Sequence, residues 1–287
     1  MKHFPDWLRK SRLLEPATFT SRTVMEKKLH TVCESAKCPN RMECWGRRTA
    51  TFMILGDVCT RKCGFCAIQA GKPLSMDADE PTHVAEAAKE LGLSHVVVTS
   101  VARDDLKGGG AEQFYETIRA IRELLPESTI EVLTPDFKGD SKSIERVCEA
   151  RPDVYNHNLE TVRRLSPFVR SPNANHDRSL ELLAYVKGNY PAIATKSGLM
   201  VGLGEKNEEV IEAFHDLHEH RCDILTVGQY LQPMEEKLLV QEFVPPDVFQ
   251  SYECEARAIG FQEVFCGPFV RSSYHAGEIS AKVLGKI

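Results

Sequence analysis

Two closely spaced groups of three cysteines constrain this chain more than any other feature of its sequence. Six of the ten cysteines fall within 34 residues, in the patterns C-x4-C-x5-C and C-x3-C-x2-C: Cys33, Cys38, Cys44, and Cys59, Cys63, Cys66. Such a density indicates ligands. Each triplet is one thiolate short of the four that a cubane iron-sulfur cluster uses, so one iron of each cluster would be open to another ligand.

Disulfides and zinc are alternative uses of such cysteines. Met1 to Lys10 lacks the apolar stretch of an export signal, which predicts a reducing, cytoplasmic setting without disulfides. Zinc stays open for either triplet taken alone, since thiolates also suit zinc, although the spacing of the second triplet disfavours it. The remaining cysteines stand singly and are expected to be small buried hydrophobic residues: Cys148, Cys222, Cys254 and Cys266.

The second triplet has an aromatic residue just before its last cysteine, in the segment Cys59-Thr60-Arg61-Lys62-Cys63-Gly64-Phe65-Cys66. It resembles the cluster loop of radical S-adenosylmethionine (SAM) enzymes. The resemblance implies that the three cysteines bind three irons of a 4Fe-4S cluster, while the amino and carboxylate groups of SAM bind the fourth. Electron transfer from the cluster would then cleave SAM to a 5'-deoxyadenosyl radical able to abstract hydrogen from an unactivated carbon.

Segments along nearly the whole chain resemble the lipoyl synthase family. They are Pro5 to Arg9, Leu29 to Cys33 with Cys38 to Asn40 and Glu43-Cys44, Thr49 to Gly56, Thr99 to Val101 with Arg103 to Leu106, Asn156 to Thr161, Lys196 to Glu205, Gly228 to Leu231, and Gly267-Pro268 with Arg271 to His275. The paired triplets and the Arg-Ser-Ser-Tyr segment are the most specific parts. The second triplet alone indicates only the superfamily.

This resemblance implies a second, auxiliary 4Fe-4S cluster on Cys33, Cys38 and Cys44, with Ser273 as its fourth ligand. A serine oxygen is a hard ligand on an iron otherwise bound to soft sulfur, so its bond should break most easily. That suits a cluster which is dismantled as a sulfur source. The implied reaction inserts two sulfur atoms, at carbon 6 and carbon 8 of a protein-bound octanoyl-lysine, and consumes one SAM per insertion. The implied catalytic residues are Cys59, Cys63, Cys66 and Ser273.

The family resemblance also implies protein partners. These are an octanoylated lipoyl-carrier domain (a 2-oxo acid dehydrogenase E2 subunit or the glycine-cleavage H protein), an electron donor such as ferredoxin or flavodoxin, and a cluster-repair protein. A net charge of -5 argues against nucleic acid as a partner, and the lack of any apolar run near 18 residues argues against a membrane span.

Three other classes of function are weighed against this one. A biotin-synthase-like enzyme acting on a free small molecule should lack the upstream triplet. A radical SAM enzyme acting on RNA should show a basic face or an added RNA-binding module. A non-catalytic iron-sulfur or zinc scaffold protein is distinguished by its metal content and visible absorption.

Alternating β-branched runs and amphipathic stretches predict an α/β fold, a partial (β/α)6 TIM-type barrel. We expect an N-terminal extension with the auxiliary ligands over 1–48, a radical SAM barrel over 49–262 and a closing C-terminal segment over 263–287, all in one integrated domain. The predicted strands are Thr49 to Leu55, His95 to Ser100, Thr129 to Leu133, Val154 to Asn158, Ala194 to Val201 and Ile224 to Gln229. The predicted helices are Thr82 to Leu91, Ala111 to Leu125, Lys142 to Ala150, Ser179 to Val186, Glu208 to His220 and Asp247 to Ile259.

Barrel enzymes carry their active sites at the carboxyl ends of the strands, and several polar residues are expected there. The candidate SAM contacts are Asn158, Glu160, Lys196, Gln229 and Asp105. Asn158 and Glu160 alternate with Leu159 and should share a face. Lys196 lies near the start of its strand, so it could instead point to the bottom of the barrel. Asp105 could instead cap a turn.

Overall fold

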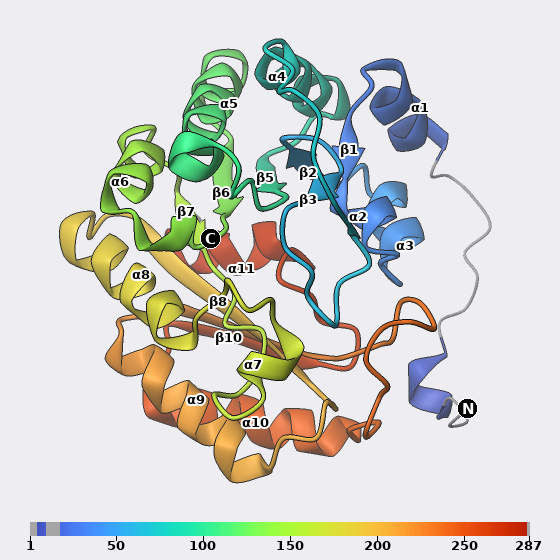
Figure 1. Ribbon diagram of the computed structural model, residues 1–287, viewed down its shortest axis with the longest axis vertical. Helices are drawn as coiled ribbons and strands as arrows, with labels where there is room; N and C mark the ends of the chain where they lie inside the picture. The colour runs from blue at the N-terminus through green and yellow to red at the C-terminus, as the bar shows by residue number, and fades with distance from the viewer. Residues whose placement is uncertain (1–4, 10–17, 286–287) are drawn as a thin grey trace.

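An open, curved sheet of eight strands forms the centre of the molecule in the computed structural model, which describes residues 5–9 and 18–285 (Figure 1). The strand order is β1-β2-β5-β6-β7-β8-β9-β10; β1 is antiparallel to β2 and every other pair is parallel. The strands are β1 His30–Thr31, β2 Thr51–Ile54, β5 His95–Ser100, β6 Thr129–Leu133, β7 Val154–Asn156, β8 Ala194–Val201, β9 Ile224–Gln229 and β10 Glu263–Gly267. A separate small sheet pairs β3 (Val58–Cys59) with β4 (Gln69–Ala70).

All six predicted strands are present, four of them with the predicted bounds, so the predicted partial barrel is confirmed. One further strand, β10, follows the last barrel helix and extends the predicted six-stranded barrel. β10 pairs in parallel with β9 from Glu263 to Gly267, so the C-terminal segment supplies a seventh parallel strand. The predicted boundary at residue 262 therefore falls just before a strand of the same sheet. Residues 1–4, 10–17 and 286–287 of the two predicted extensions lie outside the described residues.

Six longer helices surround the sheet, as Figure 1 shows. They are α4 Glu80–Leu91, α5 Ala111–Leu124, α6 Ser141–Glu149, α8 His176–Asn189, α9 Asn207–Glu219 and α10 Pro246–Ile259. Left-handed Gly92 and Gly260 end α4 and α10 as their sequence positions predict. The helix predicted to end at Val186 is longer in the structure, because α8 runs through Gly188 to Asn189, just before Tyr190 and Pro191.

Shorter elements complete the described chain. They are the helices α1 Thr18–Glu26, α2 Val32–Ser35, α3 Arg41–Gly46, α7 Ser166–Val169 and α11 Ala276–Val283, and the 3-10 turns η1 Asp6–Leu8, η2 Lys107–Gly110 and η3 Phe137–Gly139. Ile279 of α11 packs against the first residues of three strands, Val154, Ala194 and Ile224. α11 therefore closes the amino-terminal end of the barrel.

An ion pair fills the lower interior of the barrel. Lys196 Nζ lies 2.9 Å from Glu131 Oε1, and both side chains are fully buried. Asn156 donates a hydrogen bond to the same carboxylate. Burial alone would raise the pKa of Glu131, but the charges and hydrogen bonds of Lys196 and His95 together outweigh burial and bring that pKa to about 2. The interior is thus closed below this pair, and its open space lies at the carboxyl ends of the strands.

No helix among the described residues has both the length and the apolar character needed to cross a lipid bilayer.

Candidate active site

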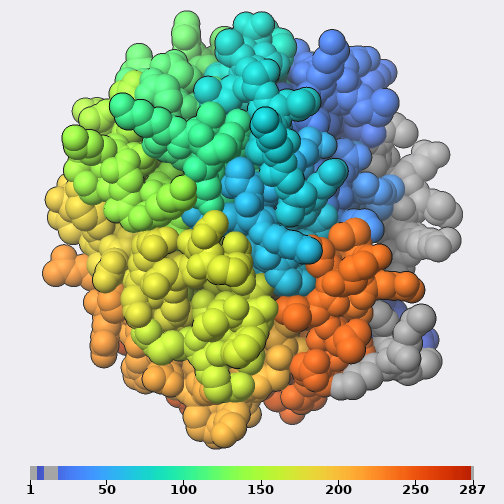
Figure 2. All heavy atoms as spheres, in the orientation of Figure 1, coloured from blue at the N-terminus to red at the C-terminus, as the bar shows by residue number. Residues whose placement is uncertain are grey.

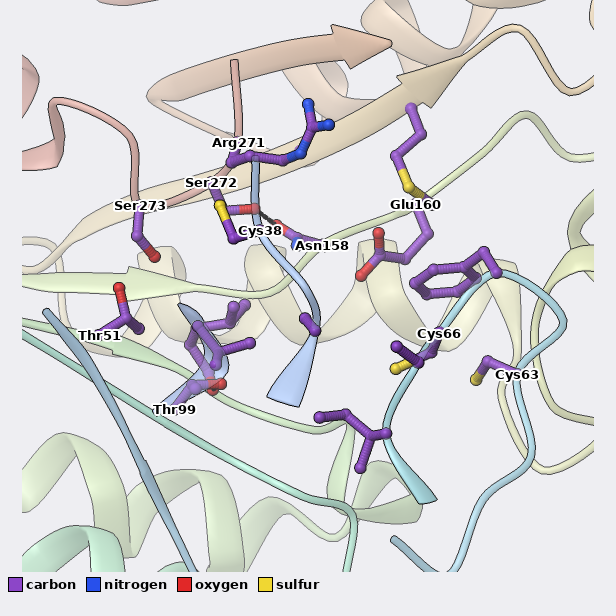
Figure 3. A pocket seen from close by; sticks show the side chains of 18 of the residues that line it. Cys38, Thr51, Cys63, Cys66, Thr99, Asn158, Glu160, Arg271, Ser272 and Ser273 are labelled. Carbon is purple, nitrogen blue, oxygen red and sulfur yellow. Dashed lines mark hydrogen bonds between the residues drawn. The ribbon is translucent and has the colours of Figure 1, made fainter. Parts of the chain in front are cut away.

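One cavity of about 540 Å³ occupies the carboxyl-terminal end of the barrel. Its lining includes all the predicted cluster ligands: Cys33, Cys38, Cys44, Cys59, Cys63, Cys66 and Ser273. In the chain, the first triplet precedes β2 and the second triplet follows it, and the serine lies in the segment after β10. Figure 3 shows Ser273 and Cys38 at one side of the cavity and Cys63 and Cys66 at the other, with Asn158 and Glu160 between them.

The loop of the second triplet, residues 59–66, is held by backbone hydrogen bonds on both sides. The Gly64 N–H donates to the Val169 carbonyl (2.9 Å), and the Leu238 N–H donates to the Gly64 carbonyl (3.1 Å). Lys237 adds a side-chain bond to the Cys63 carbonyl. In Figure 2 these three segments, coloured blue, yellow-green and orange, meet on the visible face. The loop is therefore fixed by two elements distant from it in sequence.

Arg61 anchors the same loop to the barrel. Its guanidinium donates to Asp104 (2.8 and 2.9 Å) and to Asp136 (2.5 Å). Asp136 is fully buried; burial opposes its ionisation, but the bond and charge of Arg61 lower the pKa of its carboxyl to about 2. This anchor was not predicted. Two signals in the sequence point to this ion pair. Arg61 lies between two of the predicted ligand cysteines, and Asp136 follows a predicted strand.

The thiols of the second triplet lie close enough to influence one another. Burial, with smaller contributions from the nearby Cys63, Glu160 and Cys59, raises the pKa of Cys66 to about 12. Burial likewise raises the pKa of Cys63. Buried thiols of this kind become thiolates only beside a positive centre. The irons of a 4Fe-4S cluster would supply it, so the three cysteines fit such a cluster.

The first triplet lies on two short helices beside β1. Cys33 is in α2 and Cys44 in α3, while Cys38 lies between them and donates its N–H to the Cys33 carbonyl (3.1 Å). Cys33 and Cys44 pack with Trp45 and Ala50 in a small apolar cluster separate from the main core. Burial raises the pKa of Cys33, and the neighbouring Cys38 adds to the rise. The Cys33 thiol too would need a positive centre to ionise.

The segment after β10, residues 269–275, which we call the arm, lies across the first triplet. Asn40 donates its amide to the Phe269 carbonyl (2.7 Å), and Tyr274 donates its hydroxyl to Glu43 (2.9 Å). At the other side of the arm, a Cβ on Gly228 would come within 2.1 Å of the Val270 carbonyl oxygen, so only glycine permits this approach. The arm brings Ser273 into the cavity lining.

A single zinc ion requires several ligands around one point, with thiolates at about 2.3 Å. Within the described ranges, no three or more histidine, cysteine, aspartate or glutamate side chains form such a group. Cys59, Cys63 and Cys66 are nevertheless close enough for the other two to raise the pKa of Cys66, Cys38 raises the pKa of Cys33, and Cys44 packs against Cys33. This spacing favours a cluster, in which each thiolate binds a different iron, over one zinc ion. All ten cysteines are free thiols, and Cys254 is exposed rather than buried as predicted.

Asn158 and Glu160, two of the predicted SAM contacts, line the cavity. Glu160 has a left-handed backbone (φ 72°), held by its N–H donating to the Gly198 carbonyl at 2.9 Å. Burial raises the pKa of Glu160, while the charge of Arg170 opposes that rise. Arg170 is itself buried in the cavity wall and was not predicted; the turn that carries it has no sequence signal.

Two other predicted SAM contacts do not reach the cavity. Lys196 pairs with Glu131 in the barrel interior, one level below the cavity lining, because it stands near the start of β8. Asp105 is bound in a bidentate pair by Arg103 (2.9 Å) and is absent from the lining. Both positions disagree with the predicted contacts: Lys196 balances a buried carboxylate, and Asp105 forms a local ion pair.

Gln229 lines the cavity, but its side-chain amide is used within the protein. Its Nε2 group donates to the carbonyls of Val201, Tyr230 and Glu242, and its Oε1 accepts from the Val244 N–H. The side chain thus ties β9 to residues 242–244. This arrangement disagrees with a direct side-chain contact to SAM.

Arg271 is a further lining residue that the sequence left without a role. Its burial lowers the pKa of the guanidinium, and the nearby Cys38 opposes that change. The Arg-Ser-Ser-Tyr pattern marked the segment but not the orientation of this side chain, which Figure 3 shows beside Ser272 and Asn158.

Several solved structures have a similar fold. Methylornithine synthase superposes with a TM-score of 0.54 at 13% identity, covering 88% of this chain and 79% of that chain. The maturase of the FeFe-hydrogenase gives a TM-score of 0.56 at 12% identity, covering 93% and 75%. At these identities the similarity concerns the fold alone.

The sequence comparisons are more specific. Residues 53–217 match the family model of the radical SAM superfamily. The lipoyl synthase of Rubrobacter xylanophilus is 53% identical over 276 residues, covering 96% of this chain and 85% of that protein. The lipoyl synthase of Geobacillus thermodenitrificans is 54% identical over 276 residues, covering 96% and 92%. With the fold and both cysteine triplets in place, the chain belongs to the lipoyl synthase family of radical SAM enzymes.

Proposed function

We propose that this protein inserts two sulfur atoms, at carbon 6 and carbon 8 of an octanoyl chain amide-linked to a lysine of a lipoyl-carrier domain. As a member of its family it is a sulfur-inserting enzyme that uses SAM and 4Fe-4S clusters. The observation that carries the finer proposal is that both cysteine triplets and Ser273 line one cavity. A radical formed at one end and a sulfur source at the other would share the same enclosed space.

Cys59, Cys63 and Cys66 would hold the cluster that binds SAM. When bound, that cluster supplies the electron that cleaves SAM. The protein's part is to keep the loop in place through Arg61 and to offer polar groups at the cavity wall. Asn158 and Glu160 are the proposed SAM contacts, because they lie between the two triplets (Figure 3). The surrounding lining is largely apolar, which suits an aliphatic chain and excludes water.

Cys33, Cys38, Cys44 and Ser273 would hold the auxiliary cluster, which would act as the sulfur donor. Serine oxygen matches iron less well than thiolate does, so the Ser273 ligand should be released most easily. The arm carries this ligand on the segment 269–275, joined to α3 by the Tyr274–Glu43 bond. The protein would thereby hold one iron of the auxiliary cluster through a separate piece of chain.

The proposed partners follow from the reaction. The substrate is an octanoylated lipoyl-carrier domain, from a 2-oxo acid dehydrogenase E2 subunit or the glycine-cleavage H protein. A ferredoxin or flavodoxin would supply electrons, and a cluster-repair protein would rebuild the auxiliary cluster. Ten free thiols support a reducing, cytoplasmic location.

The test is anaerobic incubation of the reconstituted protein with SAM, a reductant and an octanoyl-lysine peptide. Mass analysis should find two added sulfurs on the peptide. Intact protein should hold about eight irons, four per cluster, and loss of either triplet should halve that number. Cys254→Ala is the matched cysteine control, since Cys254 is exposed on α10, and it should change neither result. Iron near four in the intact protein, or sulfur added to free octanoate but not to the peptide, would contradict the proposal.

A further inference from the structure

A row of polar side chains runs from the arm to the SAM side of the cavity. Ser272 Oγ donates a hydrogen bond to Asn158 Oδ1 at 2.9 Å. The Asn158 side chain in turn lies close enough to the carboxylate of Glu160 to oppose the rise of its pKa that burial causes. Figure 3 shows the three residues in a row, with the Ser272–Asn158 bond drawn. Ser272 directly precedes Ser273, the proposed ligand of the auxiliary cluster, so the row starts at that ligand's neighbour.

The lack of a side chain at Gly198 leaves room for the contact between Ser272 and Asn158. A Cβ added to Gly198 would lie 2.9 Å from Asn158 Oδ1 and 3.1 Å from Ser272 Oγ. Both distances are shorter than ordinary van der Waals contact, so a side chain at Gly198 would push the two groups apart. The barrel strand β8 thus leaves room at the one point where the arm meets Asn158.

The bond from Ser272 also sets the orientation of the Asn158 amide. An asparagine side chain accepts through its oxygen and donates through its NH2 group. Since Ser272 donates to Oδ1, the NH2 group remains available to Glu160 or to bound SAM. Glu160 itself cannot shift easily, because its N–H donates to the Gly198 carbonyl and its carbonyl accepts from the Met200 N–H, both at 2.9 Å.

We propose that Ser272 is a positioning residue which couples docking of the arm to SAM binding through Asn158 and Glu160. The inference rests on the proposed function, in which Asn158 and Glu160 contact SAM. With the arm docked, Ser272 orients the Asn158 amide, and SAM meets a preformed pair of polar groups. Coupling between two sites is reciprocal, so bound SAM also holds the arm, and with it Ser273, in place.

The first experiment measures the dissociation constant of SAM by anaerobic equilibrium dialysis with the reconstituted enzyme. Ser272→Ala should weaken SAM binding roughly fivefold, the size expected for one lost net hydrogen bond. Asn158→Ala should weaken it at least as much. The double variant should be no worse than Asn158→Ala alone, because the serine acts only through the asparagine. Ser280→Ala, a buried serine of α11 in the same C-terminal segment, is the matched control and should bind SAM normally.

The second experiment follows hydrogen exchange of residues 268–275 with and without SAM. In the unmodified enzyme SAM should slow exchange of the arm, and in Ser272→Ala that protection should disappear while iron content stays normal. Normal SAM affinity in Ser272→Ala, or additive losses in the double variant, would overturn the coupling while leaving the proposed function intact. Normal affinity in Asn158→Ala would instead remove the SAM-contact assignment, and the coupling with it.

Discussion

The two cysteine sites share one cavity but are built in opposite ways. The second triplet sits on a loop that the barrel holds directly, through the buried Arg61–Asp136 pair and backbone bonds to Val169 and Leu238. The first triplet lies on two short helices outside the main core, and its proposed fourth ligand arrives from the other end of the chain. Side-chain hydrogen bonds from Asn40 and from Tyr274 are among the contacts that join these pieces.

This difference matches the different demands that the proposed function places on the two clusters. A cluster that only delivers electrons must return unchanged after each cycle, and a rigid loop serves that purpose. In the proposed function the auxiliary cluster gives up its sulfur, so it must be opened and rebuilt. A site whose ligands come from two distant segments of the chain can open when one of the segments moves.

The largest expected effect separates the two sites by their chemistry. Cys63→Ala should reduce 5'-deoxyadenosine formation to background, because the cluster that delivers the electron is lost. Cys38→Ala should leave SAM cleavage measurable and abolish sulfur insertion. Both products are quantified by mass spectrometry on reconstituted protein. Equal loss of 5'-deoxyadenosine in the two variants would show that the sites are not independent.

Replacing the proposed serine ligand should separate assembly of the auxiliary cluster from its use. Ser273→Cys should keep near-normal iron and near-normal SAM cleavage but form little lipoyl product, because a thiolate holds iron more tightly than the serine oxygen does. Iron analysis and product mass analysis check this. Ser272→Ala should have a milder effect on product. Full product from Ser273→Cys would place the fourth ligand elsewhere.

Breaking the anchor of the SAM-side loop should cost stability as well as activity. Arg61→Met leaves the buried Asp136 without its main partner, and such a loss destabilises a protein by about 3–5 kcal/mol. Urea unfolding measures the change. Because the auxiliary site does not touch this pair, the remaining iron should correspond to about one cluster. Arg103→Met, which removes an ion pair with the partly exposed Asp105, is the control and should cost much less.

The same anchor predicts a dependence of stability on pH. The pKa of Asp136 is about 2 in the folded protein and about 3.9 in an unfolded chain. Its contribution, about 2.6 kcal/mol, is therefore fully present above pH about 4 and is lost as the pH falls towards 2. Unfolding curves between these pH values should show the loss in the unmodified protein. A curve of the same slope for Asp136→Asn would contradict the assignment.

The smallest expected effect concerns the arm. Tyr274→Phe removes one hydrogen bond to Glu43 and should lower the free energy of docking by about 1 kcal/mol. SAM cleavage should stay near normal, while half of the iron should be released faster to a chelator. Faster release of all the iron would mean that the arm also supports the SAM-side loop.

Local patterns in the sequence predicted the barrel and the cluster ligands. The β-branched strands are buried on both faces, so their bounds follow from apolar runs of a few residues. The triplets are local as well, since each lies within a dozen residues. The partners of Arg61, by contrast, are 43 and 75 residues away, and a contact between such distant residues leaves no periodic signal.

The position of an inward-facing side chain along the barrel axis was equally hard to predict from the sequence. Lys196 and Asn158 both point into the barrel, but Lys196 lies at the level of Glu131 and Asn158 at the level of the cavity. The sequence pattern predicts which side of the sheet a side chain faces. Its height along the barrel axis depends on the stagger between neighbouring strands. Lys196 therefore pairs with the buried carboxylate of Glu131, below the level at which the sequence predicted a SAM contact.

The order of the ligands along the chain determines when the auxiliary site can be completed. A ribosome delivers the amino terminus first, and folding follows in that order. Strands β2 to β10 and both cysteine triplets are made before Ser273. A cluster inserted on Cys33, Cys38 and Cys44 before residues 269–275 are made would find neither its serine nor the arm. The complete auxiliary site therefore forms only after all the barrel strands have been made.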